Sequence, residues 1–184
     1  PESLAYWRDV HRETAEILVE AGQQPYLQFG EVQWWYFPQA GSGMPFYDEY
    51  TTSTFLQAHG WPMRTIVSND ADPSEYLEEA AHLKSVLGSF TSAIMAHVRA
   101  SVPDCRFEVL YPPDVNEGRF NRVVNYPEQH WNEATLDCLK TESFTYTLGR
   151  NLDLALETIR YGAGAGFPRA KRSFLVGIGD SSRD

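Results

Sequence analysis

The stretch "DCRFEVLYPPDVN", residues 104–116, decides the fold because it reads as a β-strand that follows a long helical region. Its apolar and aromatic residues form a compact run. Pro112 and Pro113 end that run, since proline cannot donate to a strand ladder. Ahead of it, apolar residues recur at helical spacing from Leu77 to Val98. A helix followed directly by a buried strand is typical of a parallel α/β sheet.

The same alternation extends in both directions along the chain. The patterns predict further strands within 23–36, 136–147 and 172–180, helices at 3–21, 47–60 and 148–164, and a helical turn near 132–137. In the 148–164 helix, an apolar stripe is expected on one side, formed by Leu148, Leu152, Ala155 and Ile159. Residues 117–131 read as a polar, aromatic connector.

This order predicts an α/β fold with a parallel sheet and outer helices. An eight-stranded barrel usually needs about 250 residues, so about four β/α units correspond to a partial (β/α)8 (TIM) barrel. We interpret residues 1–184 as a single domain and as a fragment, the C-terminal half of such a barrel, which lacks an N-terminal part of its parent chain. A doubly wound sheet is the rival fold. The Gly-rich segment 162–166 follows a helix instead of a strand, which disfavours a dinucleotide site.

Composition excludes several classes of partner. The formal charge is −10, and the one short basic cluster lies at 168–172, so binding to nucleic acid is not expected. No apolar run reaches the roughly 18 to 20 residues that span a bilayer, so no membrane contact is expected. Cys105 and Cys138 each lie beside an apolar run and are predicted to be buried free thiols.

Candidate site residues follow the strands, because the carboxyl ends of parallel strands carry the chemistry in such folds. We divide them into catalytic candidates, which are carboxylates, and substrate-binding candidates, which are mostly amide and aromatic residues. The catalytic candidates are Glu31, Glu142 and Asp180, and the substrate-binding candidates are Gln33, Trp34, Trp35, Asp114, Asn116 and Tyr146.

Glu31 and Glu142 are expected on strands two apart, with backbones roughly 10 Å apart. Inward-pointing side chains could shorten that separation to the roughly 5 to 9.5 Å used by glycosidase carboxylate pairs. A carboxyl group beside Trp34 or Trp35 would have a raised pKa, and the indole faces could stack on sugar rings. The alternative is that Glu31 only accepts hydrogen bonds within the barrel and that Asp114 caps a turn.

No cofactor or metal site is predicted. The five histidines show no metal-binding spacing, and a divalent site made of carboxylates alone, from Glu31, Asp114, Glu142 and Asp180, stays an open alternative. Nucleophilic catalysis by serine or cysteine has no supporting motif.

The segments "QFGEVQWWYF" (28–37) and "GMPFYDEYT" (43–51) resemble the fourth-strand region of glycoside hydrolase barrels. More specifically, they resemble the hydrolase-like barrels of phage tail and gene-transfer-agent tail proteins. The resemblance implies Glu31 as the general acid/base and a carbohydrate ligand such as bacterial surface polysaccharide. It also implies a location in a virion, in a phage tail or outside the cell. The expected nucleophile strand offers Asp180 and no glutamate.

Two functions therefore remain open: a glycan-cleaving or glycan-binding hydrolase-like protein, and a non-catalytic structural barrel of a phage-tail-like particle. A half barrel also leaves two sheet edges open, so we expect the chain to self-associate as a dimer.

Overall fold

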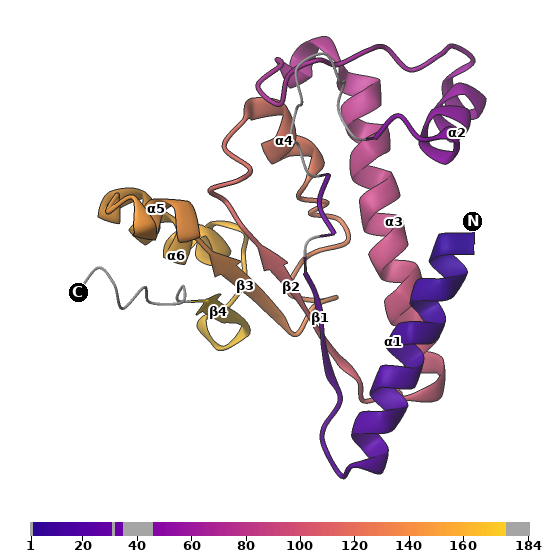
Figure 1. Ribbon diagram of the computed structural model, residues 1–184, viewed down its shortest axis with the longest axis vertical. Helices are drawn as coiled ribbons and strands as arrows, with labels where there is room; N and C mark the ends of the chain where they lie inside the picture. The colour runs from indigo at the N-terminus through magenta and orange to yellow at the C-terminus, as the bar shows by residue number, and fades with distance from the viewer. Residues whose placement is uncertain (1, 31, 35–45, 176–184) are drawn as a thin grey trace.

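The computed structural model describes residues 2–30, 32–34 and 46–175. The described chain contains four strands, six α-helices and two short 3-10 turns (Figure 1). The strands are β1 (Tyr26–Phe29), β2 (Arg106–Tyr111), β3 (Cys138–Glu142) and β4 (Arg172–Leu175). The helices are α1 (Glu2–Glu20), α2 (Glu49–His59), α3 (Leu77–Ser101), α4 (Arg119–Val124), α5 (Phe144–Leu148) and α6 (Leu152–Gly164).

The four strands form one sheet in the order β1-β2-β3-β4, and every neighbouring pair is parallel. The sheet order is therefore the chain order, as in a (β/α)8 barrel that is opened out. This arrangement confirms the α/β fold, the parallel sheet and the four strands that the sequence predicts.

The register gives the sheet two different faces. Leu27 pairs with Phe107 and Phe29 with Val109, so these side chains share one face, which we call the outer face. All four are buried, and the rings of Phe29 and Phe107 stack with centroids 5.5 Å apart. The other face, which we call the inner face, alternates with it along each strand.

Helices α1, α3 and α6 pack on the outer face. Apolar residues of α3 join the strand residues in one buried cluster, and α1 runs along α3 (Figure 1). The α3 residues in this cluster are Leu87, Ile94, Met95 and Val98. Burial of large apolar side chains contributes about 1.5–3 kcal/mol each, so this layer dominates the stability of the fold.

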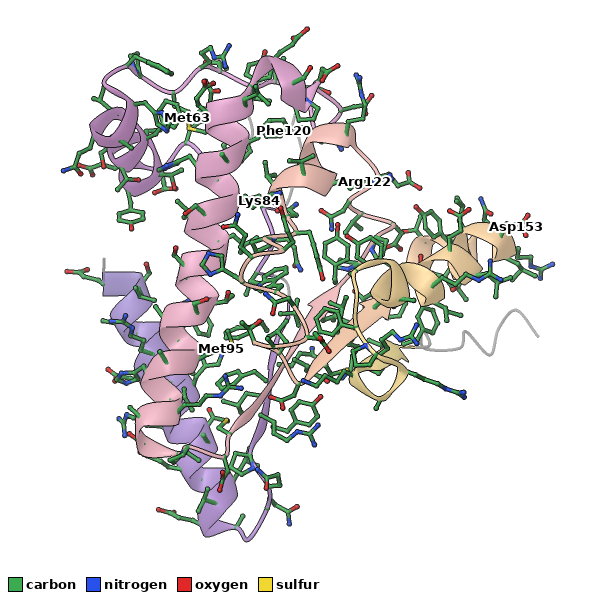
Figure 2. All side chains as sticks on the ribbon, turned by 180° about the vertical axis from the view of Figure 1, so that it is seen from behind. Met63, Lys84, Met95, Phe120, Arg122 and Asp153 are labelled. Carbon is green, nitrogen blue, oxygen red and sulfur yellow. The ribbon has the colours of Figure 1, made fainter. Side chains whose placement is uncertain are left out.

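Helix α3 is longer than the strands and supports a second cluster near their carboxyl ends. Ala80 and Leu83 pack there against Phe46, Ile66 and Phe120. Figure 2 marks the two clusters with Met95, in the first, and Phe120, in the second. Helix α2 lies beside this second region. Its N-cap is Asp48, whose Oδ1 accepts from the Thr51 amide at 3.0 Å, and Gly60 ends it at φ 78°, as the sequence indicates.

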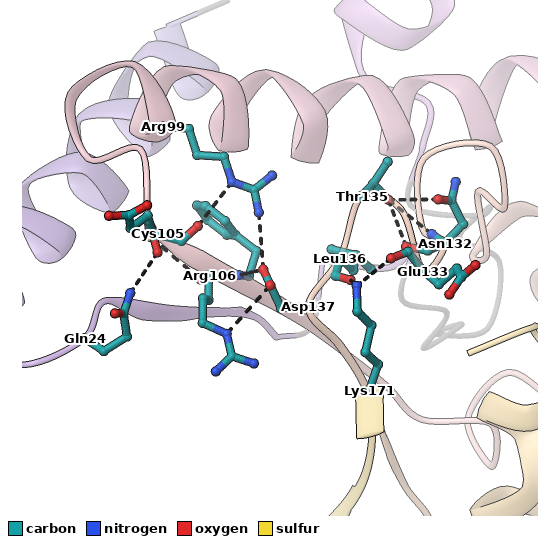
Figure 3. A network of polar contacts seen from close by, with 12 residues as sticks. Gln24, Arg99, Cys105, Arg106, Asn132, Glu133, Thr135, Leu136, Asp137 and Lys171 are labelled. Atoms are coloured by element: carbon teal, nitrogen blue, oxygen red, sulfur yellow. Dashed lines mark hydrogen bonds and ion pairs between the residues drawn. The ribbon is translucent and has the colours of Figure 1, made fainter. Parts of the chain in front are cut away.

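A polar network ties the strands together at the opposite end of the sheet (Figure 3). Asp137 Oδ2 accepts from the Phe107 amide at 2.9 Å and from Arg99 Nη2 at 3.3 Å. Arg99 Nε donates in turn to the Cys105 carbonyl at 3.1 Å. Asp137 thereby joins the end of α3 to the starts of β2 and β3.

Three sequence expectations need correction. Residues 119–124 form helix α4 within the supposed connector, where Phe120, Asn121 and Val124 are buried. The strand predicted at 136–147 ends at Glu142, and residues 144–148 form helix α5 instead. The helix predicted at 148–164 begins only at Leu152, as α6, because Arg150 adopts φ 57° between α5 and α6. The short helical turn predicted near 132–137 is confirmed, since the amides of Thr135 and Leu136 donate to the Asn132 carbonyl.

The apolar stripe predicted for 148–164 is also wrong, since Leu148, Leu152 and Ile159 are exposed. Helix α6 instead turns small residues toward the sheet, and Ala155, Thr158 and Gly162 are buried. Thr141 Oγ1 donates to the Thr158 carbonyl at 3.1 Å. A Cβ at Gly162 would lie 3.0 Å from the Arg172 side chain. The close approach of α6 to β4 therefore explains why α6 presents small residues to the sheet.

Cys105 and Cys138 are free and buried, which confirms the prediction for both thiols. Among the described helices, none has the length and apolar character needed to cross a membrane.

We expect Asp137→Ala to lower the free energy of unfolding by about 2–3 kcal/mol, because the Phe107 amide and Arg99 lose a charged acceptor. Asp104→Ala is the matched control. Its side chain is exposed in the loop that precedes β2, and we expect a change within about 0.5 kcal/mol. Urea denaturation measures both. Equal losses in the two variants would contradict the role given to Asp137.

Candidate functional site

The described candidate residues lie on the segments that leave the carboxyl ends of the strands. Gln33 and Trp34 follow β1, Asp114 and Asn116 follow β2, and Tyr146 lies in α5 after β3. Glu31, Trp35 and Asp180 lie outside the described residues, so their proposed roles stay predictions. We call the described strand-end segments the rim.

Asn125, just after α4, connects two of the predicted residues. Its Oδ1 accepts from the Trp34 amide at 2.7 Å, and its Nδ2 donates to the Trp34 carbonyl at 3.2 Å. The same Nδ2 donates to Asn116 Oδ1 at 2.7 Å, and Asn116 Nδ2 donates to the Pro112 carbonyl at 2.9 Å. Both asparagines are buried. They hold the segments after β1 and β2 together.

Gln33 and Asp114 make similar internal bonds. Gln33 Nε2 donates to the Leu110 carbonyl at 3.0 Å. Asp114 accepts from the Val115 amide at 3.1 Å and from the Thr145 amide at 2.9 Å. Both side chains are buried, and Asp114 thereby fixes the start of α5. These contacts agree with the alternative in which Asp114 organises a turn.

Tyr146 lies in a small pocket between α4 and α6. Its hydroxyl donates to a carboxylate oxygen of Glu117, and burial together with Glu117 raises the pKa of Tyr146. The pocket has a volume of about 270 Å³, and Asn116, Tyr111 and Arg122 also line it.

Trp34 lines a different pocket, of about 620 Å³, beside α2 and α3. The Trp34 indole donates from Nε1 to the Leu83 carbonyl at 3.2 Å, which anchors it to α3. His82 and Thr54 line the same pocket. Burial lowers the pKa of His82, whose Nε2 lies 3.1 Å from the Thr51 carbonyl oxygen. Trp34 and Tyr146 therefore do not share one of these pockets.

Glu142 ends β3, two strands from β1 as expected, and lies on the inner face with Lys140. Lys140 Nζ donates to Gln28 Oε1 at 3.0 Å and forms an ion pair with Glu108. Gln28, Glu108 and Lys140 come from three adjacent strands, so the centre of the inner face carries an internally paired polar cluster.

Within the described residues, no group of three or more His, Cys, Asp and Glu side chains is arranged to hold a metal ion. The carboxylate-only alternative depends on Glu31 and Asp180, which lie outside this part of the chain.

Sequence reasoning missed Asn125 and Lys140. Asn125 lies in a segment that shows no helical periodicity, and its partners are 9 and 91 residues away in the sequence. Lys140 lies in the middle of β3, between Leu139 and Thr141, and a charged residue at that position was the available signal for a polar inner face.

A parallel sheet in chain order, with helices on its outer face and loops gathered at the strand ends, defines the class of partial (β/α)8 barrels. The family described as non-contractile tail sheath protein TIM barrel matches residues 1–184, and the chain belongs to this family. Comparison with curated proteins and with solved structures found no significant match. The family match supports the phage-tail part of the resemblance and gives no support to glycoside hydrolysis.

We expect Asn125→Ala to lower the free energy of unfolding by about 2–4 kcal/mol, since it removes three hydrogen bonds and leaves the Trp34 amide without its acceptor. Gln129→Ala removes an exposed amide side chain from the same segment and serves as the control, with an expected change within about 0.5 kcal/mol. Thermal unfolding followed by circular dichroism distinguishes them. If the two midpoints match, Asn125 does not connect the rim.

Proposed function

We propose that the chain acts as a non-catalytic structural barrel in a non-contractile phage tail. Membership of the tail sheath family supports this role. The main structural observation in its favour is that the described rim side chains form internal hydrogen bonds. Gln33, Asp114 and Asn116 are buried and bonded to the backbone of neighbouring segments, so they hold loops in place.

Such a rim suits a protein that works through its shape. The side chains of Asp114 and Asn116 bond to neighbouring segments, and losing these bonds would cost stability, whereas Gln33 Oε1 is buried without a hydrogen-bond partner among the described residues. A protein that assembles into a tail sheath benefits from rigid loops. Neighbouring subunits then recognise fixed surfaces, and no free energy is lost in ordering flexible loops on assembly.

The enzymatic alternative needs Glu31 as general acid/base and a second carboxylate, Glu142 or Asp180. Glu142 shares the inner face with Lys140 and with Glu108, which Lys140 pairs. In a retaining glycosidase the second carboxylate acts as the nucleophile and the first as the acid/base. The predicted acid therefore rests on Glu31 alone.

The test compares catalysis with assembly. We expect the wild-type chain and Glu31→Gln to release no reducing ends from labelled bacterial surface polysaccharide. We also expect phage whose sheath protein carries Glu31→Gln to form tails in normal number, whereas Asn125→Ala reduces tail yield because the rim loosens. Reducing-end assays and electron microscopy of lysates provide the readouts.

The structural role would be wrong if the wild-type chain cleaved polysaccharide and Glu31→Gln lost at least about 100-fold of that rate, as expected for a general acid. Asn125→Ala is expected to lower the amount of folded sheath protein below that of the wild type. If tails still formed in normal number under that condition, the structural role would also be contradicted.

A further inference from the structure

The small pocket at the rim that contains Tyr146 brings three tyrosines together, and we call it the tyrosine pocket. Tyr111 is the last residue of β2, Tyr146 lies in α5 and Tyr161 lies in α6. The described residues that line the pocket lie between positions 111 and 161, and its volume is about 270 Å³. It opens at the carboxyl ends of the strands, where (β/α)8 barrels bind their ligands.

Tyr111 brings an unused polar group to this pocket. Its side chain is 0% exposed, and its hydroxyl has no hydrogen-bond partner among the described residues. The Tyr161 ring stacks on the Tyr111 ring with centroids 4.9 Å apart, and the two hydroxyls are near each other without a hydrogen bond of normal geometry. A buried hydroxyl without a partner costs free energy and calls for an explanation. A ligand in the pocket would supply the missing partner.

Arg122 adds strong donors at the same place. Its side chain is exposed on α4 (Figure 2), and among the described residues it makes one long hydrogen bond, from Nη2 to the Glu117 carbonyl at 3.5 Å. Burial raises the pKa of Tyr111, Tyr146 and Tyr161, and the charge of Arg122 opposes that rise in each. The guanidinium therefore lies near all three hydroxyls and has donors left for a ligand.

The wall of the pocket also carries acceptors. A carboxylate oxygen of Glu117 accepts from the Tyr146 hydroxyl, and the exposed Glu157 of α6 lines the pocket as well. An anionic ligand would meet these two carboxylates, and a cationic ligand would meet Arg122. A neutral ligand with several hydroxyl groups can instead donate to a carboxylate and accept from the guanidinium.

Size and apolar lining narrow the choice further. Sites for drug-sized ligands usually measure about 300–1,000 Å³, so this pocket suits a ligand of about one ring. Tyr146, whose hydroxyl is held by Glu117, lines it together with Pro113 and Leu154. Aromatic and apolar side chains can pack against the C–H groups of a sugar ring, while the polar groups bond to its hydroxyls.

We propose that the tyrosine pocket binds one sugar residue of a glycan. Arg122 and the Tyr111 hydroxyl donate to sugar oxygens, Glu157 accepts from a sugar hydroxyl, and the Tyr146 ring packs against the C–H groups. Tyr111 thereby gains the partner that it lacks. This role goes beyond the structural one and does not depend on it, because a tail component with rigid loops can also bind a sugar.

The test is an NMR titration of the ¹⁵N-labelled chain. Glucose, galactose, mannose and N-acetylglucosamine are added separately, each up to about 50 mM, and we expect at least one of them to bind with a dissociation constant of about 1–10 mM. The shifts should saturate and should centre on the amides of Glu117, Tyr146 and Tyr161.

Two variants test the contacts. Tyr111→Phe removes only the hydroxyl and keeps the stacked ring. Its melting temperature should equal or exceed that of the wild type, because an unpaired buried hydroxyl is lost, and its sugar affinity should fall at least about 5-fold. Arg122→Met should also lower the affinity at least about 5-fold, and its circular dichroism spectrum should not change because Arg122 is exposed.

Tyr126→Phe is the matched control. The Tyr126 ring lies 5.3 Å from the Tyr111 ring, but its hydroxyl donates to the Trp131 carbonyl at 3.2 Å, and Tyr126 is not among the residues that line the pocket. This variant should bind the sugar within about 2-fold of the wild type.

Acetate and methylammonium serve as probes for the other two ligand classes. Saturable shifts at the pocket with either ion and with none of the sugars would overturn the proposal. It would also be overturned if no sugar gave saturable shifts at the pocket, or if Tyr111→Phe bound the sugar as tightly as the wild type, since a water molecule alone would then satisfy the hydroxyl.

Discussion

Parallel pairing of the four strands is the constraint on which the rest of the structure depends. Each parallel pair needs a connection that returns to the starting end of the sheet, and such connections place α3 and α6 against the outer face. The outer face is accordingly apolar, with Phe107 and Val109 fully buried. The inner face has no such connections and carries Lys140 and Glu108. The division of the sheet into an apolar and a polar face therefore follows from topology.

The same constraint brings the rim residues together. Strands that all point in one direction deliver their following segments to one edge, where amide and carboxylate side chains can reach each other's backbone. In this chain, the neighbouring side chains hold the strand-end segments to one another. Asn125 links Trp34 with Asn116, and Asp114 fixes the start of α5. An enzyme would need some of these groups directed at a ligand. Their internal bonding fits a barrel that contributes surface and rigidity to a tail sheath.

Much of the fold could be predicted from local patterns, because those patterns report burial and capping. The long α3 stripe, the two prolines after β2 and the Asp48 cap each have a direct physical meaning, and each is observed. The errors have a physical origin too. Helix α4 has only six residues, too short to show periodicity, and the exposed leucines of α6 imitate a core stripe while small residues make the real contact. The site residues were harder to interpret, since hydrogen bonds such as those of Asn125 join segments far apart in sequence.

Cohesion of the rim through Asn125 is the central structural claim, and hydrogen–deuterium exchange of the wild-type chain and of Asn125→Ala tests it most directly. In the wild type, the Trp34 amide donates to Asn125 Oδ1 and should exchange slowly. In Asn125→Ala this amide has lost its acceptor and should exchange faster. The Phe107 amide, which Asp137 holds at the opposite end of the sheet, should exchange at the same rate in both proteins. Equal exchange of the Trp34 amide in the two proteins would contradict the claim.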